Sequence, residues 1–260
     1  TNVTIPKSVT SIGSSVFYGC TALTGVLLEN GSTLTYNDLG VNESQIATYW
    51  NEDNLTWTLT ADGTMTISGE GEMKDYYIDN SPARNNSSVK KVVIEKGVTN
   101  IEMHAFQDCS SLASIEIPDS VTSIGEHAFS GCSSLTDITI PGSVTSIGIS
   151  AFQKCTNLTS IVIPEGVTSI GACAFQDCSG LTSVTIPKSV TSIGRNAFSG
   201  CTVLKKVLLE NGSKLTSERL GVSENQIGTY WNEGNLTWTL AADGTMTISG
   251  SGAMKEYYGS

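Results

Sequence analysis

The chain repeats one phrase every 23 residues, and this period restricts its fold more than any other feature. The dipeptide Ile-Pro recurs at that step from Ile117 to Ile186, and apolar residues keep the same phase before and after these copies. A unit this short cannot bury its own apolar side chains, so successive units must stack and bury one another. The sequence therefore predicts a repeat solenoid.

Each unit follows the pattern L-x-x-I-x-I-P-x-x-V-T-S-I-G-x-x-A-F-x-x-C. In the copy from Leu112 to Cys132, an alternating segment ends at Pro118, and a second short apolar segment closes at Gly125. Alternation is typical of a strand, and proline ends a ladder because it lacks a donor. We expect a mostly β solenoid with a parallel sheet on one face and short turns or helical segments on the other.

The cysteines follow the same period, which predicts their state. Six of the seven share one repeat position, whereas Cys173 is out of phase. Stacked side chains of equivalent residues run parallel, and a disulfide needs them to converge. We expect the six to be free and buried on the inner side of the coil, and Cys173 to be the exposed, reactive thiol. The six are Cys20, Cys109, Cys132, Cys155, Cys178 and Cys201.

A longer repeat is superimposed on the short one, because the segment beginning at Val3 returns at Val184, an offset of 181 residues. Its non-solenoid part carries Asp62-Gly63 between two alternating runs, which is a strong hairpin signal. We expect a hairpin at about residues 55–69 that caps the solenoid, with aromatic packing from Tyr49-Trp50, Trp57 and Tyr76-Tyr77. Helical phase predicts a short helix within Gly40–Trp50.

These patterns divide the chain into four expected parts. Residues 1–31 end one repeat block, and residues 32–88 form an inter-block module with the hairpin. Residues 89–212 form the main block, and residues 213–260 are a truncated second copy of the module. We expect the first strand and the last hairpin each to lack a neighbour, so that any oligomer would follow from truncation.

Composition excludes several classes of partner. The formal net charge is −11, which opposes binding to nucleic acid and adsorption to anionic lipid, since both need clustered Lys and Arg. No apolar run is long enough for a membrane span, so we expect no membrane insertion.

The sequence offers few candidate residues for a metal, cofactor or catalytic site. His104 and His127 share a repeat position with Cys173, but Cys173 lies two strand spacings from His127, which is too far for one ion. We expect the histidines to be exposed turn residues. Residues 51–54 offer oxygen ligands without the spacing of a calcium loop, and Gly234 replaces Asp53 in the second copy. No nucleophile or phosphate-loop motif is present, so we expect no enzyme, metal or cofactor.

The repeat unit I-P-x-x-V-T-S-I-G-x-x-A-F-x-x-C resembles the BspA-like, or Treponema-type, leucine-rich repeat family. The segment W-T-L-x-x-D-G-T-M-T-I-S-G-x-G-x-M is similar to a module found beside such repeats in proteins of gut anaerobes. The resemblance implies a bacterial protein that is secreted or attached to the cell surface, and some members bind host extracellular-matrix proteins or other bacteria. A departure is Glu95, which takes the proline position of its unit.

The outward side of the parallel sheet is the candidate binding face, because solenoids use such faces for recognition. We expect an adhesin-like role toward a host extracellular protein or another bacterial surface component. The alternative is a purely structural spacer, which the small polar residues of the face favour equally. The candidate residues are Ser114, Glu116, Asp137, Thr139, Ser160, Val162, Ser183 and Thr185, with Lys206 and Leu208 continuing the two rows.

Charges on neighbouring units are expected to fix register. Lys96 lies one repeat before Asp119, and Glu165 lies one repeat before Lys188. Exposed pairs of this kind contribute about 0–1 kcal/mol each, so they favour a structural role over ligand binding.

Overall fold

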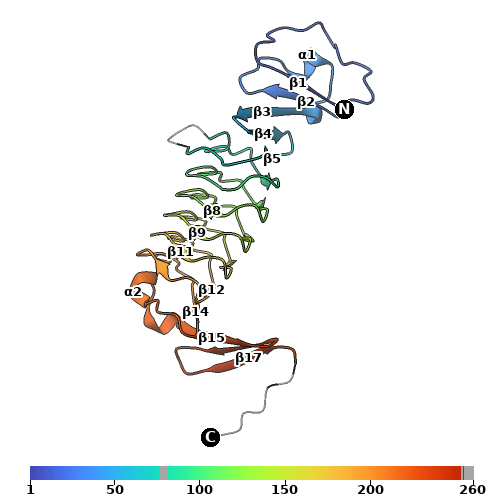
Figure 1. Cartoon of the computed structure of the whole chain (residues 1–260). Coiled ribbons are helices and arrows are strands. Elements are labelled where there is room, and N and C mark those ends of the chain that lie inside the picture. The colour runs from blue at the N-terminus through green and yellow to red at the C-terminus, as the bar shows by residue number, and fades with distance from the viewer. Residues whose placement is uncertain (77–80, 253, 255–260) are drawn as a thin grey trace.

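The protein is a long solenoid whose first strand, β1 (Asn2–Ile5), and last strand, β17 (Met246–Gly250), lie at opposite ends (Figure 1). The computed structural model describes residues 1–76, 81–252 and 254. Tyr77, which was expected in an aromatic cluster, lies outside the described residues. The predicted mostly β solenoid with parallel sheets is confirmed.

The N-terminal half is built on one sheet with the strand order β1-β2-β3-β4-β5-β6-β7 in the described part of the chain. Neighbouring strands are parallel from β1 to β3 and again from β5 to β7, whereas β3, β4 and β5 run antiparallel. The predicted hairpin around Asp62 is confirmed as β4 and β5, and it extends the sheet edge to edge. The strands after β1 are β2 (Gly25–Glu29), β3 (Ile46–Glu52), β4 (Leu55–Thr60), β5 (Thr64–Gly69), β6 (Lys91–Ile94) and β7 (Ser114–Glu116).

The C-terminal half repeats this plan in a second sheet of order β10-β12-β14-β15-β16-β17 within the described residues. The pairs β10–β12, β12–β14 and β14–β15 are parallel, and the last three strands are antiparallel. The strands before β17 are β10 (Ser160–Val162), β12 (Ser183–Ile186), β14 (Lys206–Glu210), β15 (Ile227–Glu233) and β16 (Leu236–Leu240).

A third, narrow parallel sheet follows the second apolar segment of each unit. Its strands have the order β13-β11-β9-β8, and each is two residues long. The glycine that closes the segment is required by close stacking, because a Cβ on Gly148 would meet the carbonyl carbon of Gly125 at 2.5 Å. The strands are β8 (Ser123–Ile124), β9 (Ser146–Ile147), β11 (Ser169–Ile170) and β13 (Ser192–Ile193).

The core is a column of equivalent side chains, as the period predicts. Five phenylalanine rings stack face to face with centroids 5.1–5.3 Å apart, and their exposure is at most 1%. The three central rings are each covered on both faces by a neighbouring phenylalanine, so no unit forms a core alone. The five are Phe106, Phe129, Phe152, Phe175 and Phe198.

The inter-block module contains less helix than expected. Helix α1 (Tyr36–Leu39) begins at the Thr35 capping box and ends at Gly40, whose φ of 70° is left-handed. After the 3-10 helix η1 (Glu43–Gln45), the chain enters strand β3. The short helix predicted within Gly40–Trp50 is limited to the 3-10 helix η1, and the chain is a strand from Ile46 on, because pairing of β3 with β2 and β4 outweighs the helical phase.

Among the module's aromatic residues, Trp57 and Tyr76 join the core of the main block and Trp50 packs against it, as predicted. Trp57 is fully buried, with its ring 5.5 Å from Phe106 and 5.8 Å, edge-on, from Tyr76. The second copy of the module keeps the same elements, with α2 (Ser217–Leu220) and η2 (Glu224–Gln226) before β15. No helix in the described part of the chain has the length and apolar character needed to cross a membrane.

Candidate binding face

The predicted binding residues lie on the outward side of the parallel sheet, and the second sheet brings several of them together. On β10 and β12 the outward residues are more exposed than the buried ones between them, because side chains alternate across a strand. Strand pairing places equivalent residues side by side in two rows. The rows are Ser160–Ser183–Lys206 and Val162–Thr185–Leu208.

The face is interrupted near Asp137. Thr139 reaches Val162 through one isolated bridge, and Asp137 lies in no strand although it is exposed. Asp is disfavoured in strands, and this carboxylate accepts a hydrogen bond from the Thr136 hydroxyl at 3.1 Å. Strand β7, with Ser114 and Glu116, is paired to β6 instead. The expectation that all the candidates form continuous rows is therefore wrong at this point.

Val162 is the most exposed apolar residue of the face. Its exposure is 71%, and its paired neighbours are Thr139 and Thr185. None of the candidate positions carries an aromatic ring. A small aliphatic patch framed by hydroxyl groups can contact a protein partner, but it lacks the flat aromatic platform that proteins use to stack sugars.

A shallow hollow lies beside Glu116 at the end of β6 and β7, and sequence reasoning did not find it. Its volume is about 540 Å³. Glu116 pairs with Lys91 at 2.6 Å, so its carboxylate is held at the rim. The sequence feature that could have indicated this hollow is Glu95, which stands where the next four units have proline. The lining residues are Ile94, Glu95, Lys96, Glu116, Ile117 and Pro118.

The charge pairs that stabilise register differ from those predicted. Lys188 pairs with Glu210 at 2.9 Å rather than with Glu165, and Lys7 pairs with Glu29 at 3.1 Å. Among the described residues, no ion pair joins Lys96 to its expected partner one repeat later. In each observed pair the lysine follows one strand and the glutamate ends the neighbouring strand. The glutamate carboxylate also accepts a hydrogen bond from the lysine backbone N–H.

The two histidines stack with ring centroids 5.1 Å apart, which confirms that they share a position. Both lie in turns, as predicted, but they are only partly exposed. This repeat position needs a left-handed backbone, with φ of 60° at His104 and 53° at His127, and Cys173 adopts the same conformation. Burial, followed by electrostatic repulsion from the neighbouring His104 ring, lowers the pKa of His127. In the described part of the chain, no three ligand-type residues are clustered for a metal.

The cysteines are free, as predicted, but Cys20 is exposed rather than buried, and Cys173, predicted to be exposed, is only partly exposed. Cys20 is exposed, because no repeat unit covers it on its N-terminal side. Cys132 donates its thiol to the carbonyl of Phe106 at 3.2 Å, and Cys155, Cys178 and Cys201 repeat this contact one unit further on each time. Burial raises the pKa of Cys155 to about 12, so these thiols are unreactive.

Residues 51–54 span the end of β3 and the turn into β4, and side-chain oxygen atoms of the first three already have protein partners. The Asn51 side chain accepts from Thr56, Glu52 accepts from the Tyr76 hydroxyl, and Asp53 pairs with Lys74 at 3.7 Å. Asp53 has a φ of 49°, and its counterpart Gly234 has 60°. The substitution of glycine for aspartate is thus explained by turn geometry rather than by loss of a calcium ligand.

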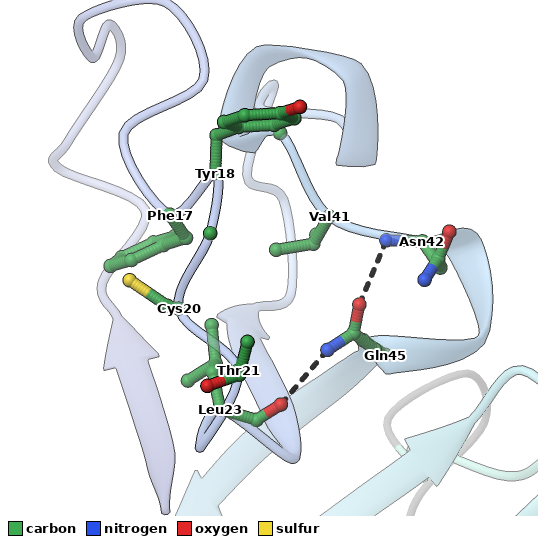
Figure 2. A pocket seen from close by; sticks show the side chains of 10 residues that line it. Phe17, Tyr18, Cys20, Thr21, Leu23, Val41, Asn42 and Gln45 are labelled. Carbon is green, nitrogen blue, oxygen red and sulfur yellow. Dashed lines mark hydrogen bonds between the residues drawn. The ribbon is translucent and has the colours of Figure 1, made fainter.

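A second hollow lies at the N-terminal end, between the first repeat unit and the module (Figure 2). Its volume is about 390 Å³, with Phe17, Tyr18 and Cys20 along one side. Gln45 bridges its floor, because its amide donates to the Leu23 carbonyl at 3.0 Å and its carbonyl accepts from the Asn42 backbone at 2.9 Å. Sequence reasoning did not find this hollow either.

Comparison with known proteins gives a family match over most of the chain. A model of the "BspA type Leucine rich repeat region" matches residues 1–49 and 78–214 in six copies. A search of curated proteins found no match.

Solved structures give further likenesses. A leucine rich cell surface protein from Faecalibacterium prausnitzii A2-165 is 31% identical with a TM-score of 0.49; the match covers 82% of this chain and 60% of that protein. The T. pallidum leucine rich repeat protein is 27% identical with a TM-score of 0.51, covering 68% of this chain and 92% of that one. The pneumococcal vaccine antigen PcpA, at 21% identity, a TM-score of 0.53 and coverage of 90% and 51%, shows the shared fold. The chain therefore spans only part of the length of two of these proteins.

Proposed function

The chain belongs to the BspA-type leucine-rich repeat family, and from that premise we propose that it is a non-enzymatic bacterial protein that binds another protein. The partner is a host extracellular protein or another bacterial surface component, and the place of action is the cell surface or the extracellular space. The candidate strand face is the binding surface.

The exposure of Val162 is the observation that carries this proposal. An aliphatic side chain that is 71% exposed lies on β10, the edge strand of the second sheet, between Thr139 and Thr185. Valine suits a strand in a spacer as well, but only a protein interface gains apolar contact area from its exposed side chain. The neighbouring serine and threonine hydroxyls can donate and accept hydrogen bonds around it.

The hollow beside Glu116 supplies a second contact point near the face. It combines apolar lining from Ile94 and Ile117 with charges of both signs from Glu95 and Lys96. Shape and charge complementarity at such a point give specificity and orientation to a partner that covers the strand face.

A structural spacer is the second candidate, and a specific observation favours it. The solenoid is long, and its first and last strands lie at opposite ends (Figure 1). Such a rod separates whatever is joined to its two ends. The interruption at Asp137 also reduces the continuous face that a partner would meet.

A binding screen separates the two candidates. The chain is immobilised and exposed to extracellular-matrix proteins, mucins and bacterial surface glycans, and each partner is retested on Val162→Lys. The matched control is Ile149→Lys, because Ile149 is also an exposed aliphatic residue, at 46%, but lies outside the strand face. We expect a protein partner whose binding is lost in Val162→Lys and kept in Ile149→Lys. Equal loss in both variants, or no partner in the panel, contradicts strand-face binding and favours the spacer.

A further inference from the structure

Two of the three arginines in the sequence line one hollow. The hollow lies between the turn that follows β13 and helix α2, and its volume is about 370 Å³. The backbone N–H of Phe198 donates to the Leu220 carbonyl at 2.8 Å, so the two sides of the hollow are held together. The lining residues are Arg195, Asn196, Thr216, Glu218 and Arg219.

The two guanidinium groups have few partners within the protein. Across the residues that the structure describes, neither arginine forms an ion pair, and Arg195 has no side-chain hydrogen bond. Arg219 donates one hydrogen bond, to the Ile193 carbonyl at 3.4 Å. Since a guanidinium carries five N–H donors, most of this donor capacity is left for a ligand. Both arginines are exposed, so a ligand can reach them.

The first copy of the longer repeat lacks the arginine pair. At the offset of 181 residues, Ser14 stands in place of Arg195 and Asp38 in place of Arg219. The formal charge of the five lining positions is therefore +1 in the second copy and −1 in the first, with Glu218 included. Because both copies have the same elements, the fold itself does not require the two arginines.

Arg219 also replaces a residue that caps the helix. In the first copy the Asp38 carboxylate accepts hydrogen bonds from the Thr35 backbone N–H at 2.8 Å and from its hydroxyl at 2.7 Å, which completes the capping box of α1. The equivalent Thr216 makes no capping hydrogen bond with its side chain. A local departure that loses a stabilising contact without a structural gain is typical of a functional position.

The chemistry of the hollow suits a carboxylate. Guanidinium groups bind carboxylates through paired N–H···O hydrogen bonds. Glu218 leaves the lining with a single net positive charge, which favours a singly charged group over a doubly charged phosphate. None of the five lining residues is aromatic, so the hollow lacks a platform on which a sugar could stack. The net charge of −11 opposes a long polyanion.

We propose that this hollow binds a carboxylate of an acidic peptide segment in a protein partner. Arg195 and Arg219 pair with the carboxylate oxygens, and Asn196 and Thr216 supply further donors beside them. None of the lining residues belongs to the candidate strand face, so this site is tested independently of binding at that face.

Nitrogen-15 NMR of the arginine side chains tests the proposal, because the three arginines give three Nε–Hε signals. The probe is acetyl-Gly-Glu-Gly-amide, and its matched control is the same peptide with glutamine. We expect the glutamate peptide to shift the signals of Arg195 and Arg219 and to leave Arg84, which lies outside the hollow, unchanged. These shifts are expected to shrink as the salt concentration rises, and the glutamine peptide is expected to cause none.

The first copy supplies variants that suit the fold. Arg195→Ser and Arg219→Asp each install the residue of the first copy, and each is expected to weaken peptide binding by about tenfold or more. Arg219→Asp is not expected to lower the urea midpoint, because the aspartate can cap the helix with Thr216. Lys214→Thr is the control, since it also installs a first-copy residue and removes a positive charge outside the hollow. It is expected to bind the peptide like the wild type.

Sialyllactose and inorganic phosphate are titrated in parallel as a carboxylated sugar and a phosphate. A shift of both arginine signals at a lower concentration of either one than of the glutamate peptide would overturn the peptide assignment. The proposal is also overturned if the glutamate peptide moves neither signal, if the glutamine peptide moves them equally, or if Lys214→Thr weakens binding as much as the arginine variants do. Loss of binding in both arginine variants with unchanged circular dichroism supports it.

Discussion

The two copies of the longer repeat have nearly the same sequence and opposite surroundings. In the first copy the hairpin is covered by the main block, while the preceding repeat unit is open on its outer side. In the second copy the repeat unit is covered and the hairpin is open. Trp57 is fully buried in the first, whereas its equivalent Trp238 is only partly buried.

The hydrophobic cores show the same contrast. Val207, Leu209 and Leu220 of the second copy belong to the long core of the main block. The equivalent Val26, Leu28 and Leu39 form a separate, smaller cluster at the N-terminal end. Burial of a residue in this protein is therefore determined by its neighbouring unit as much as by its own sequence, as expected for a quasi-one-dimensional fold.

Truncation of a stacked phenylalanine gives the largest expected difference between covered and open units. Phe152 lies 5.3 Å from both Phe129 and Phe175, so Phe152→Ala leaves a closed cavity and is expected to cost about 3–5 kcal/mol. Phe17→Ala removes a partly exposed ring and is expected to cost about 1 kcal/mol. Urea unfolding followed by circular dichroism measures both. Equal losses would show that the open end is packed as tightly as the centre.

Thiol reactivity gives a comparison that does not depend on unfolding energies. Cys20 and Cys201 are equivalent, yet Cys20 is exposed and Cys201 is 8% exposed with a pKa raised to about 12 by burial. In native protein we expect Ellman's reagent to modify Cys20 and Cys173 quickly and the other five only after unfolding.

Cysteine-to-serine variants show which thiols account for the fast phase of modification by Ellman's reagent. Cys20→Ser is expected to remove one fast-reacting thiol, whereas Cys201→Ser is expected to leave the fast phase unchanged. Fast modification of Cys201 in the native protein would contradict its burial under the preceding unit.

The ion pairs Lys7–Glu29 and Lys188–Glu210 are expected to give the smallest difference between the two copies, because they are equivalent. Hydrogen bonds from Lys7 and Lys188 lower the pKa of Glu29 and Glu210 below the ordinary value of 4.5. A lowered pKa contributes stability above the unfolded-state value, and this contribution is lost as the pH falls through the folded-state value. Glu29→Gln and Glu210→Gln are therefore expected to lower the urea midpoint slightly and equally at pH 7, and both effects are expected to shrink as the pH is lowered below 4.5. Unequal changes in the urea midpoint would show that the ion pair contributes differently in the two copies.

The short period predicted most of the fold from sequence. It placed the strands, the phenylalanine column and the buried cysteines, since each depends on one unit lying against its own equivalent. It also predicted which side chains of β10 and β12 point outward. The ligand-binding role of those side chains stays a prediction.

The wrong predictions concern residues whose surroundings differ from those of the equivalent residues in other repeat units. Cys20 has the periodic position without the covering unit, and Asp137 has the strand position with a side chain that disfavours strands. Ile46 to Trp50 fits a helical phase, but strand partners distant in sequence pair with it. Glu95 was visible as a departure, although the hollow beside it depended on the three-dimensional packing of Ile117 and Pro118.

Hydrogen exchange of the two hairpin strands tests most directly whether neighbours determine burial. Strands β5 and β17 share the sequence Met-Thr-Ile-Ser-Gly, so their intrinsic exchange rates are nearly equal. Mass spectrometry distinguishes them by the residues that follow, Glu70 and Ser251. At a concentration where the chain is monomeric, we expect strong protection in β5, which is paired on both edges, and much faster exchange in β17. Equal protection of the two strands would contradict the dependence of burial on neighbouring units.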